Sequence, residues 1–172
     1  MSRTFRRCVV VSSWLISLSL LQAIAVGQEA AAVIAGKELA RIVPTSFYFQ
    51  GQSGLTQMRN AAAARLGANR LVIAGMVDTS GYASDVRARY EGFLITDSAI
   101  SVGGQSLGTG AYGFGFSSDG KLTVFDISGK ELLSVAAASD KGLRRPRPLM
   151  MTKGSDGIRL YSGRNYVVIA AQ

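Results

Sequence analysis

The chain has 172 residues, with 19 lysines and arginines against 11 acidic residues, one cysteine and no histidine. Without an imidazole, Ser-His-Asp and Cys-His hydrolases, the usual zinc sites and His-ligated haem are excluded, and we expect no cofactor and no metal. A formal net charge of +8 favours anionic partners, but the excess is too small and too dispersed to predict nucleic-acid binding.

The first 27 residues are predicted to be a signal peptide. Three arginines within residues 3–7 precede an apolar run over residues 8–26, and small residues stand at Ala25 and Gly27. Cleavage after either small residue removes Cys8, so the mature chain has no thiol for a disulfide, a metal site or catalysis. The pattern predicts a periplasmic or extracellular protein. The alternative is an uncleaved anchor, because the apolar run is long enough to cross a bilayer.

Residues 28–44 form an alanine-rich lead-in, and residues 45–172 are expected to be a single β-rich domain. The lead-in is expected to be a short helix or a mobile segment that settles by docking on the domain. The domain opens with a predicted strand over residues 45–50, which places Phe47 and Phe49 on one face.

A helix is predicted over residues 54–66. Apolar residues recur there at spacings of three and four, and Gly67 follows where a helix commonly ends. The predicted apolar stripe comprises Leu55, Met58, Ala62 and Leu66.

From residue 70 onward, short apolar or alternating runs separated by glycine turns predict consecutive β-hairpins. The predicted strands cover residues 71–77, 85–96, 100–102, 112–116, 122–127, 132–137, 149–152, 158–161 and 166–170. The expected fold class is therefore α+β, a mainly antiparallel β-sandwich or small barrel of about eight strands with one packed helix.

Residues 108–113 match the letters of a dinucleotide-binding G-x-G-x-x-G motif. That motif must join a strand to a helix, whereas these glycines lead into another strand, so we do not predict nucleotide binding. On this strand Tyr112, Phe114 and Phe116 share one face, and Gly113 and Gly115 share the bare opposite face. The aromatic face is expected to be core. If it lines a cleft instead, Tyr112 and Phe114 would stack on a ligand.

The segment from Ile100 to Tyr112 has an apolar strand, a G-x-x-L turn, a glycine and an aromatic strand. It resembles a hairpin of uncharacterised secreted bacterial β-sandwich domains, in which a proline usually stands at the position of Gly108. The resemblance covers about 20 of the 172 residues. It implies an extracytoplasmic all-β or α+β module and assigns no active residue.

Basic residues gather in and near a proline-containing connection, residues 141–148, and comprise Lys141, Arg144, Arg145, Arg147 and Lys153. Guanidinium groups on a stiffened loop suit phosphate or carboxylate ligands. We therefore take Arg144, Arg145 and Arg147 as candidate ligand-binding residues. The alternative is an ordinary solvated loop that resists aggregation.

Acid–base chemistry without histidine would need carboxylates, and the possible members are Asp78, Asp85, Glu91 and Asp97. Asp78 and Asp85 flank a turn and are expected to cap backbone N–H groups. Glu91 shares a predicted strand face with Arg87 and Arg89, which favours an ion pair. No spacing singles out two acids, so no catalytic residue is predicted.

These features predict an exported, non-catalytic binding or structural module that meets an anionic envelope component or a partner protein. One alternative is a calycin-like carrier, whose open barrel would hold a small apolar ligand. The other is a carboxylate-dependent hydrolase of polysaccharide, which needs two acids facing each other across a groove.

Overall fold

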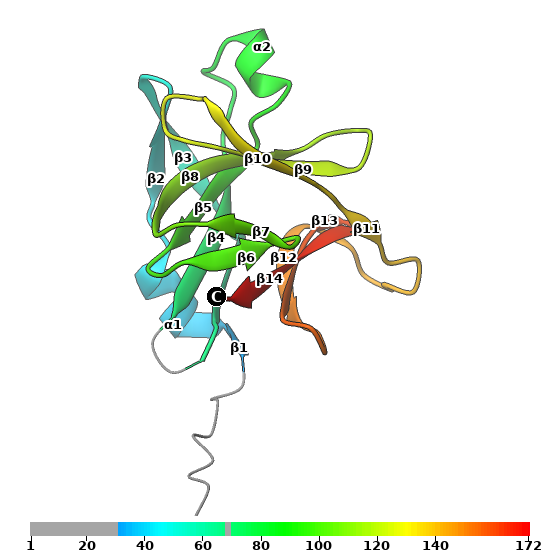
Figure 1. Ribbon diagram of the computed structural model, residues 1–172. Coiled ribbons are helices and arrows are strands. Elements are labelled where there is room, and N and C mark those ends of the chain that lie inside the picture. Colours follow the sequence, from blue (N-terminus) through cyan, green and yellow to red (C-terminus); the bar gives the residue numbers. More distant parts are fainter. Residues whose placement is uncertain (1–30, 68–69) are drawn as a thin grey trace, which may run out of the picture.

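The computed structural model describes residues 31–67 and 70–172, which form two antiparallel β-sheets (Figure 1). The first sheet runs in the order β1 (Ala32–Ile34), β3 (Gln52–Arg65), β4 (Leu71–Val77), β5 (Gly92–Thr96), β8 (Gly110–Phe116), β9 (Lys121–Phe125) and β10 (Glu131–Ala136), with β2 (Ser46–Phe49) also paired to β3. The second runs in the order β12 (Arg147–Lys153), β13 (Ile158–Gly163), β14 (Asn165–Ala171), β6 (Ile100–Val102) and β7 (Gln105–Leu107), with β11 (Ala138–Ser139) paired to β14. The protein is an α+β sandwich and not a closed barrel.

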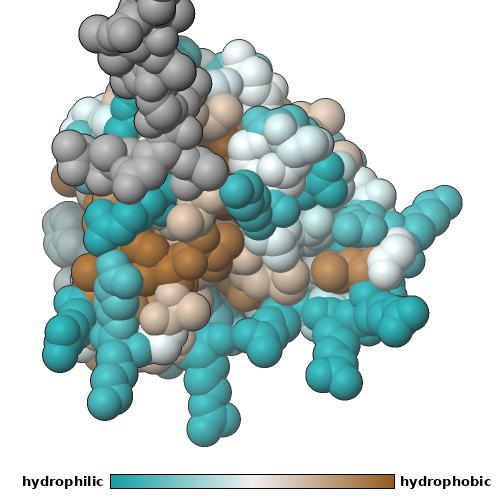
Figure 2. Space-filling view, turned by 90° about the horizontal axis from the view of Figure 1, so that it is seen from below, coloured by the Kyte–Doolittle hydropathy of each residue, from teal (hydrophilic) through white to brown (hydrophobic). Residues whose placement is uncertain are grey.

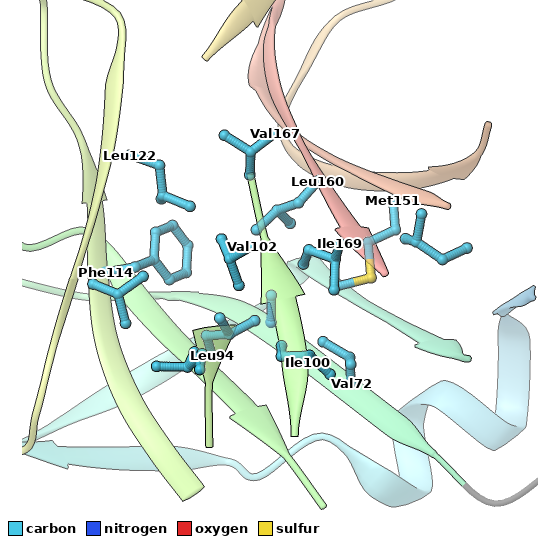
Figure 3. Packing of buried hydrophobic residues seen from close by; sticks show 14 of the residues in the cluster. Val72, Leu94, Ile100, Val102, Phe114, Leu122, Met151, Leu160, Val167 and Ile169 are labelled. Atoms are coloured by element: carbon cyan, nitrogen blue, oxygen red, sulfur yellow. The ribbon is translucent and has the colours of Figure 1, made fainter. Parts of the chain in front are cut away.

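Side chains from both sheets fill the space between them, and we call this set the interior cluster (Figure 3). The first sheet contributes alternate residues such as Val72, Leu94 and Phe114, whereas the second contributes residues such as Leu160 and Ile169. Each of these five side chains is almost completely buried. Their period of two is the pattern expected of strands that bury one face.

A second group of buried residues, the outer cluster, lies on the other face of the first sheet. Two helices, α1 (Gly36–Ile42) and α2 (Ser84–Arg87), lie at opposite ends of this sheet, and α1 packs on the outer cluster through Leu39 and Ile42. Strand β2 adds Phe47, which stacks on Phe93 with ring centroids 5.0 Å apart. Because both of its faces are covered, the first sheet requires apolar residues at consecutive positions.

The helix predicted over residues 54–66 is wrong, because these residues belong to β3. Ala62 and Ala64 face the interior cluster, while Ala61 and Ala63 face the outer cluster. Only small side chains fit between two packed layers at this position. The limited space, and not helix propensity, therefore explains the alanines of β3. Leu55, which the helical stripe would have buried, is 69% exposed.

The single alternating strand predicted over residues 85–96 is also wrong in its first half. The chain forms α2, turns, and begins β5 only at Gly92. Tyr90 and Leu94 therefore do not share a face: Tyr90 lies in the outer cluster and Leu94 in the interior cluster. The alternation of apolar and polar residues over residues 85–96 includes a helical turn, so it does not indicate one continuous strand.

The remaining predicted strands are confirmed as β2, β4, β6, β8, β9, β10, β12, β13 and β14, and the structure adds β1, β7 and β11. Gly103 and Gly104 form the β6–β7 turn with φ values of +55° and +89°, the backbone geometry that a two-residue hairpin loop requires. The described part of the lead-in forms β1 and α1. The predicted signal peptide, residues 1–27, lies outside the described residues, and within the described ranges no helix is long and apolar enough to span a membrane.

Candidate functional site

The basic loop, residues 140–147, connects β11 to β12 and is held from two directions. Arg164, at the β13–β14 turn, donates through Nη1 to the carbonyl oxygens of Asp140, Lys141 and Leu143, at 3.4, 3.1 and 2.7 Å. The Asp140 carboxylate accepts hydrogen bonds from the Gly142 N–H at 2.9 Å and from the Tyr161 hydroxyl at 3.1 Å. These contacts satisfy backbone groups that a loop would otherwise leave to water, and they fix the base of the loop on the second sheet.

The loop and β12 together line an open hollow of about 550 Å³, which we call the basic depression. Its lining residues are Leu143, Arg144, Arg145, Arg147, Met150 and Met151. All three candidate arginines are exposed and lie around this one hollow. The ion pairs in residues 31–67 and 70–172 are Arg65–Glu38, Lys121–Asp119 and Arg159–Asp156, none of which engages these guanidinium groups.

The candidate aromatic residues on β8 lie elsewhere. Phe114 is 1% exposed in the interior cluster, and Tyr112 packs against that cluster while its hydroxyl donates to the Gly108 carbonyl at 2.9 Å. Burial raises the pKa of Tyr112 above its ordinary value. β8 belongs to the first sheet and the basic loop leads into the second, so the structure does not bring these aromatic residues and the arginines together.

The bare face of β8 is filled by the chain itself. A Cβ atom at Gly113 would collide with the Phe49 ring, and one at Gly115 would collide with the Arg89 carbonyl oxygen. The glycines of the G-x-G-x-x-G match therefore lead into a strand against which a ring and a second backbone pack closely.

Three of the four candidate carboxylates accept hydrogen bonds from backbone N–H groups, namely Asp78, Glu91 and Asp97. Asp78 accepts from Ser80 at 3.0 Å, as predicted for a turn, and Asp97 accepts from Leu71 at 2.7 Å. The hydrogen bonds from Ser80 lower the pKa of Asp78. Asp85 lies exposed in α2. Among the described residues, no group of three or more acidic, histidine or cysteine residues is arranged to hold a metal ion.

The ion pair predicted between Glu91 and Arg87 or Arg89 is not formed. Glu91 instead accepts a hydrogen bond from the Phe116 N–H at 3.1 Å, and burial raises the pKa of Glu91. Arg89 donates to the Gly129 carbonyl at 3.0 Å and lies over the Phe125 ring, 5.1 Å from its centroid. The prediction fails because these residues do not share one strand: the chain leaves α2 and turns before β5 begins.

Further hollows lie outside the basic depression in the part of the chain that the structure describes. One of about 580 Å³ lies between the β2–β3 hairpin tip and the turn after β9, where Gln50 adopts a positive φ of 46°. Another of about 490 Å³ lies on the second sheet beside the Gly103–Gly104 turn and Tyr166. Neither is lined by a cluster of cationic side chains.

On the side that carries α1 and β1, long hydrophilic side chains project separately from the molecule around an apolar area (Figure 2). Val33 on β1 is 40% exposed. This surface differs from the basic depression, where three guanidinium groups line one hollow.

The sequence predicts the arginines of the basic depression but gives no indication of Arg164, Leu143 or Met150. Arg164 stands more than 20 residues along the chain from the carbonyl groups it holds, so no local spacing indicates the contact. Leu143 and Met150 are single apolar residues without a pattern of their own.

Comparison with protein-family models, with curated proteins and with solved structures finds no match to this chain.

Proposed function

We propose that the protein is an exported, non-catalytic binding module whose basic depression holds an anionic component of the cell envelope. Export rests on the signal-peptide pattern of residues 1–27. The observation that carries the binding function is the convergence of Arg144, Arg145 and Arg147 on one hollow, without an ion pair within the described ranges.

Guanidinium groups are planar, permanently charged donors that match the oxygen geometry of phosphate and carboxylate groups. Arg164 and Asp140 hold the base of the loop, so less conformational entropy is lost when the arginines close on a ligand. The space between the sheets is filled by the interior cluster, which supports a binding site on the surface rather than inside the sandwich.

The binding proposal is tested with vesicles of phosphatidylcholine that contain a minority of phosphatidylglycerol. We expect the purified protein to co-sediment with them at low salt and less so at high salt, because salt screens exposed charges. Arg144→Gln/Arg145→Gln/Arg147→Gln should weaken binding about tenfold or more, since charge-assisted hydrogen bonds are lost.

The matched control removes three exposed arginines from other elements, Arg41→Gln/Arg59→Gln/Arg87→Gln. It lowers the net charge by the same amount and should retain most of the vesicle binding. Equal losses of vesicle binding in the two triple variants would show that binding depends on net charge alone and would overturn the proposal. All the proteins share one N-terminus, so any contribution from it cancels.

Export is tested by mass spectrometry of the protein recovered from the producing cells and their envelope. We expect a mature chain that begins at Gln28 or Val26, outside the cytoplasm. A full-length chain confined to the cytoplasm would contradict the export proposal while leaving the binding proposal to the vesicle assay.

A further inference from the structure

The basic depression is not lined by arginines alone. Leu143 and Met150 are half-buried, and Met151 is 6% exposed. Met151 belongs to the interior cluster, so the apolar part of the hollow is continuous with the core. Cationic and apolar side chains therefore line one hollow, which is unlike a site built for a small hydrated anion.

The position of β12 explains this mixed lining. β12 is the end strand of the second sheet, and its pairing with β13 is irregular between Arg147 and Met150. Neighbouring residues on a strand point to opposite faces, so Met150 lies on the outer side of β12 and Met151 on the inner side. Both reach the same hollow because it lies at the edge of the sheet.

We propose that the ligand is an anionic amphiphile, with a phosphate or carboxylate head on an alkyl chain. This inference rests on the proposed function and names the chemical class that the same site selects. The head contacts the guanidinium groups, while the chain covers Leu143 and Met150 and removes their apolar surface from water. Methionine suits this role because its flexible thioether adapts to the shape of an alkyl chain. A volume of about 550 Å³ is within the range of small-molecule sites.

The test compares two soluble probes that carry the same head, monomeric decyl phosphate and ethyl phosphate, by isothermal titration calorimetry. Burial of even two methylene groups strengthens binding about tenfold. We therefore expect decyl phosphate to bind at least about tenfold more tightly than ethyl phosphate. Equal affinities would overturn the amphiphile inference and leave the proposed anion-binding function standing, whereas failure of both probes and of the vesicles would overturn both.

Leu143→Gln/Met150→Gln should remove most of the preference for decyl phosphate and leave the affinity for ethyl phosphate within about twofold. Retained binding of ethyl phosphate shows that the variant is folded. The matched control is Leu132→Gln/Met58→Gln, an equivalent pair of residues that are 45% and 40% exposed away from the depression. A similar loss in the control would assign the preference to general surface hydrophobicity and contradict the inference.

A membrane lipid and a free amphiphile present the same chemistry, and vesicles containing phosphatidylglycerol distinguish these sources. Binding of vesicles but not of monomeric decyl phosphate, with loss in Leu143→Gln/Met150→Gln, identifies a membrane lipid. Binding of the monomer but not of the vesicles, with the same loss, identifies a free amphiphile, whereas binding of both assigns the site to a lipid that the membrane presents. If the variant keeps the wild-type affinity for every probe, the apolar lining has no role and the inference is wrong.

Discussion

Gly115 has no room for a side chain, because a Cβ atom there would collide with the Arg89 carbonyl oxygen. We predict that Gly115→Ala lowers the free energy of unfolding by about 2 kcal/mol or more, since a backbone group cannot move aside cheaply. Urea denaturation measures the change. Gly108→Ala is the control, because a Cβ atom there would lie at an ordinary 3.8 Å from the Tyr112 hydroxyl. Equal stabilities of the two variants would contradict the close packing between β8 and the chain before β5.

Glu91 links stability to pH. Burial raises the pKa of Glu91 above its ordinary 4.5 in the folded protein, so the folded state binds this proton more tightly than the unfolded state. The contribution of Glu91 to stability is therefore greatest below 4.5 and declines as pH rises through the raised pKa. Glu91→Gln keeps an oxygen for the Phe116 N–H and removes the titration.

We predict that the stability of Glu91→Gln relative to wild type increases between roughly pH 4 and pH 8, as measured by urea denaturation at each pH. The comparison isolates Glu91 because the other carboxylates titrate in both proteins. A difference that stays constant with pH, or that is larger in acid, would show that burial does not raise the pKa of this group.

At the scale of single elements, the basic loop depends on Arg164. Its guanidinium group donates to three loop carbonyl groups. We predict that Arg164→Gln speeds amide hydrogen exchange at Gly142 and Leu143 about tenfold, since local opening becomes easier. Arg145→Gln, which removes an exposed charge from the same loop, should leave the exchange of these amides unchanged. Unchanged exchange in Arg164→Gln would mean that the loop is held by other contacts.

A strand over β3 and the helix that its sequence favours predict opposite effects of two substitutions on stability. Ala63 is fully buried against the outer cluster, so Ala63→Leu should lower the free energy of unfolding by about 2 kcal/mol through overpacking. Leu55 is 69% exposed, and Leu55→Ala should change stability by less than about 1 kcal/mol. A helix with the stripe that the spacing suggests would bury Leu55 and expose Ala63. A larger loss from Leu55→Ala than from Ala63→Leu in thermal or urea denaturation would therefore contradict the strand.

The elements that sequence alone predicts are those whose signals are local. Strands such as β4 and β13 are short apolar runs bounded by turn residues, so pattern and position agree. β3 could not be predicted in the same way, because its alanines respond to layers on both sides that form from distant segments. The strand predicted over residues 85–96 is wrong in its first half for a related reason, since a helical turn interrupts the alternation before β5.

At the scale of the whole molecule, the sandwich brings three parts of the chain together at one edge of the second sheet. The loop supplies the arginines, β12 supplies the methionines, and the β13–β14 turn supplies Arg164. The arginine cluster was predictable because its members are neighbours in the sequence. The apolar lining and the anchoring contact were not, because they depend on how β12 pairs with β13 and where the β13–β14 turn lies.

Anion binding in the basic depression is tested by nuclear magnetic resonance of the isotope-labelled protein during titration with ethyl phosphate. We expect the side-chain Nε–H signals of Arg144, Arg145 and Arg147 to shift, together with the backbone amides of the loop, while the Nε–H signals of Arg41 and Arg59 stay in place. Shifts spread evenly over all arginines, or concentrated around Tyr166 or the β2–β3 hairpin tip, would contradict it.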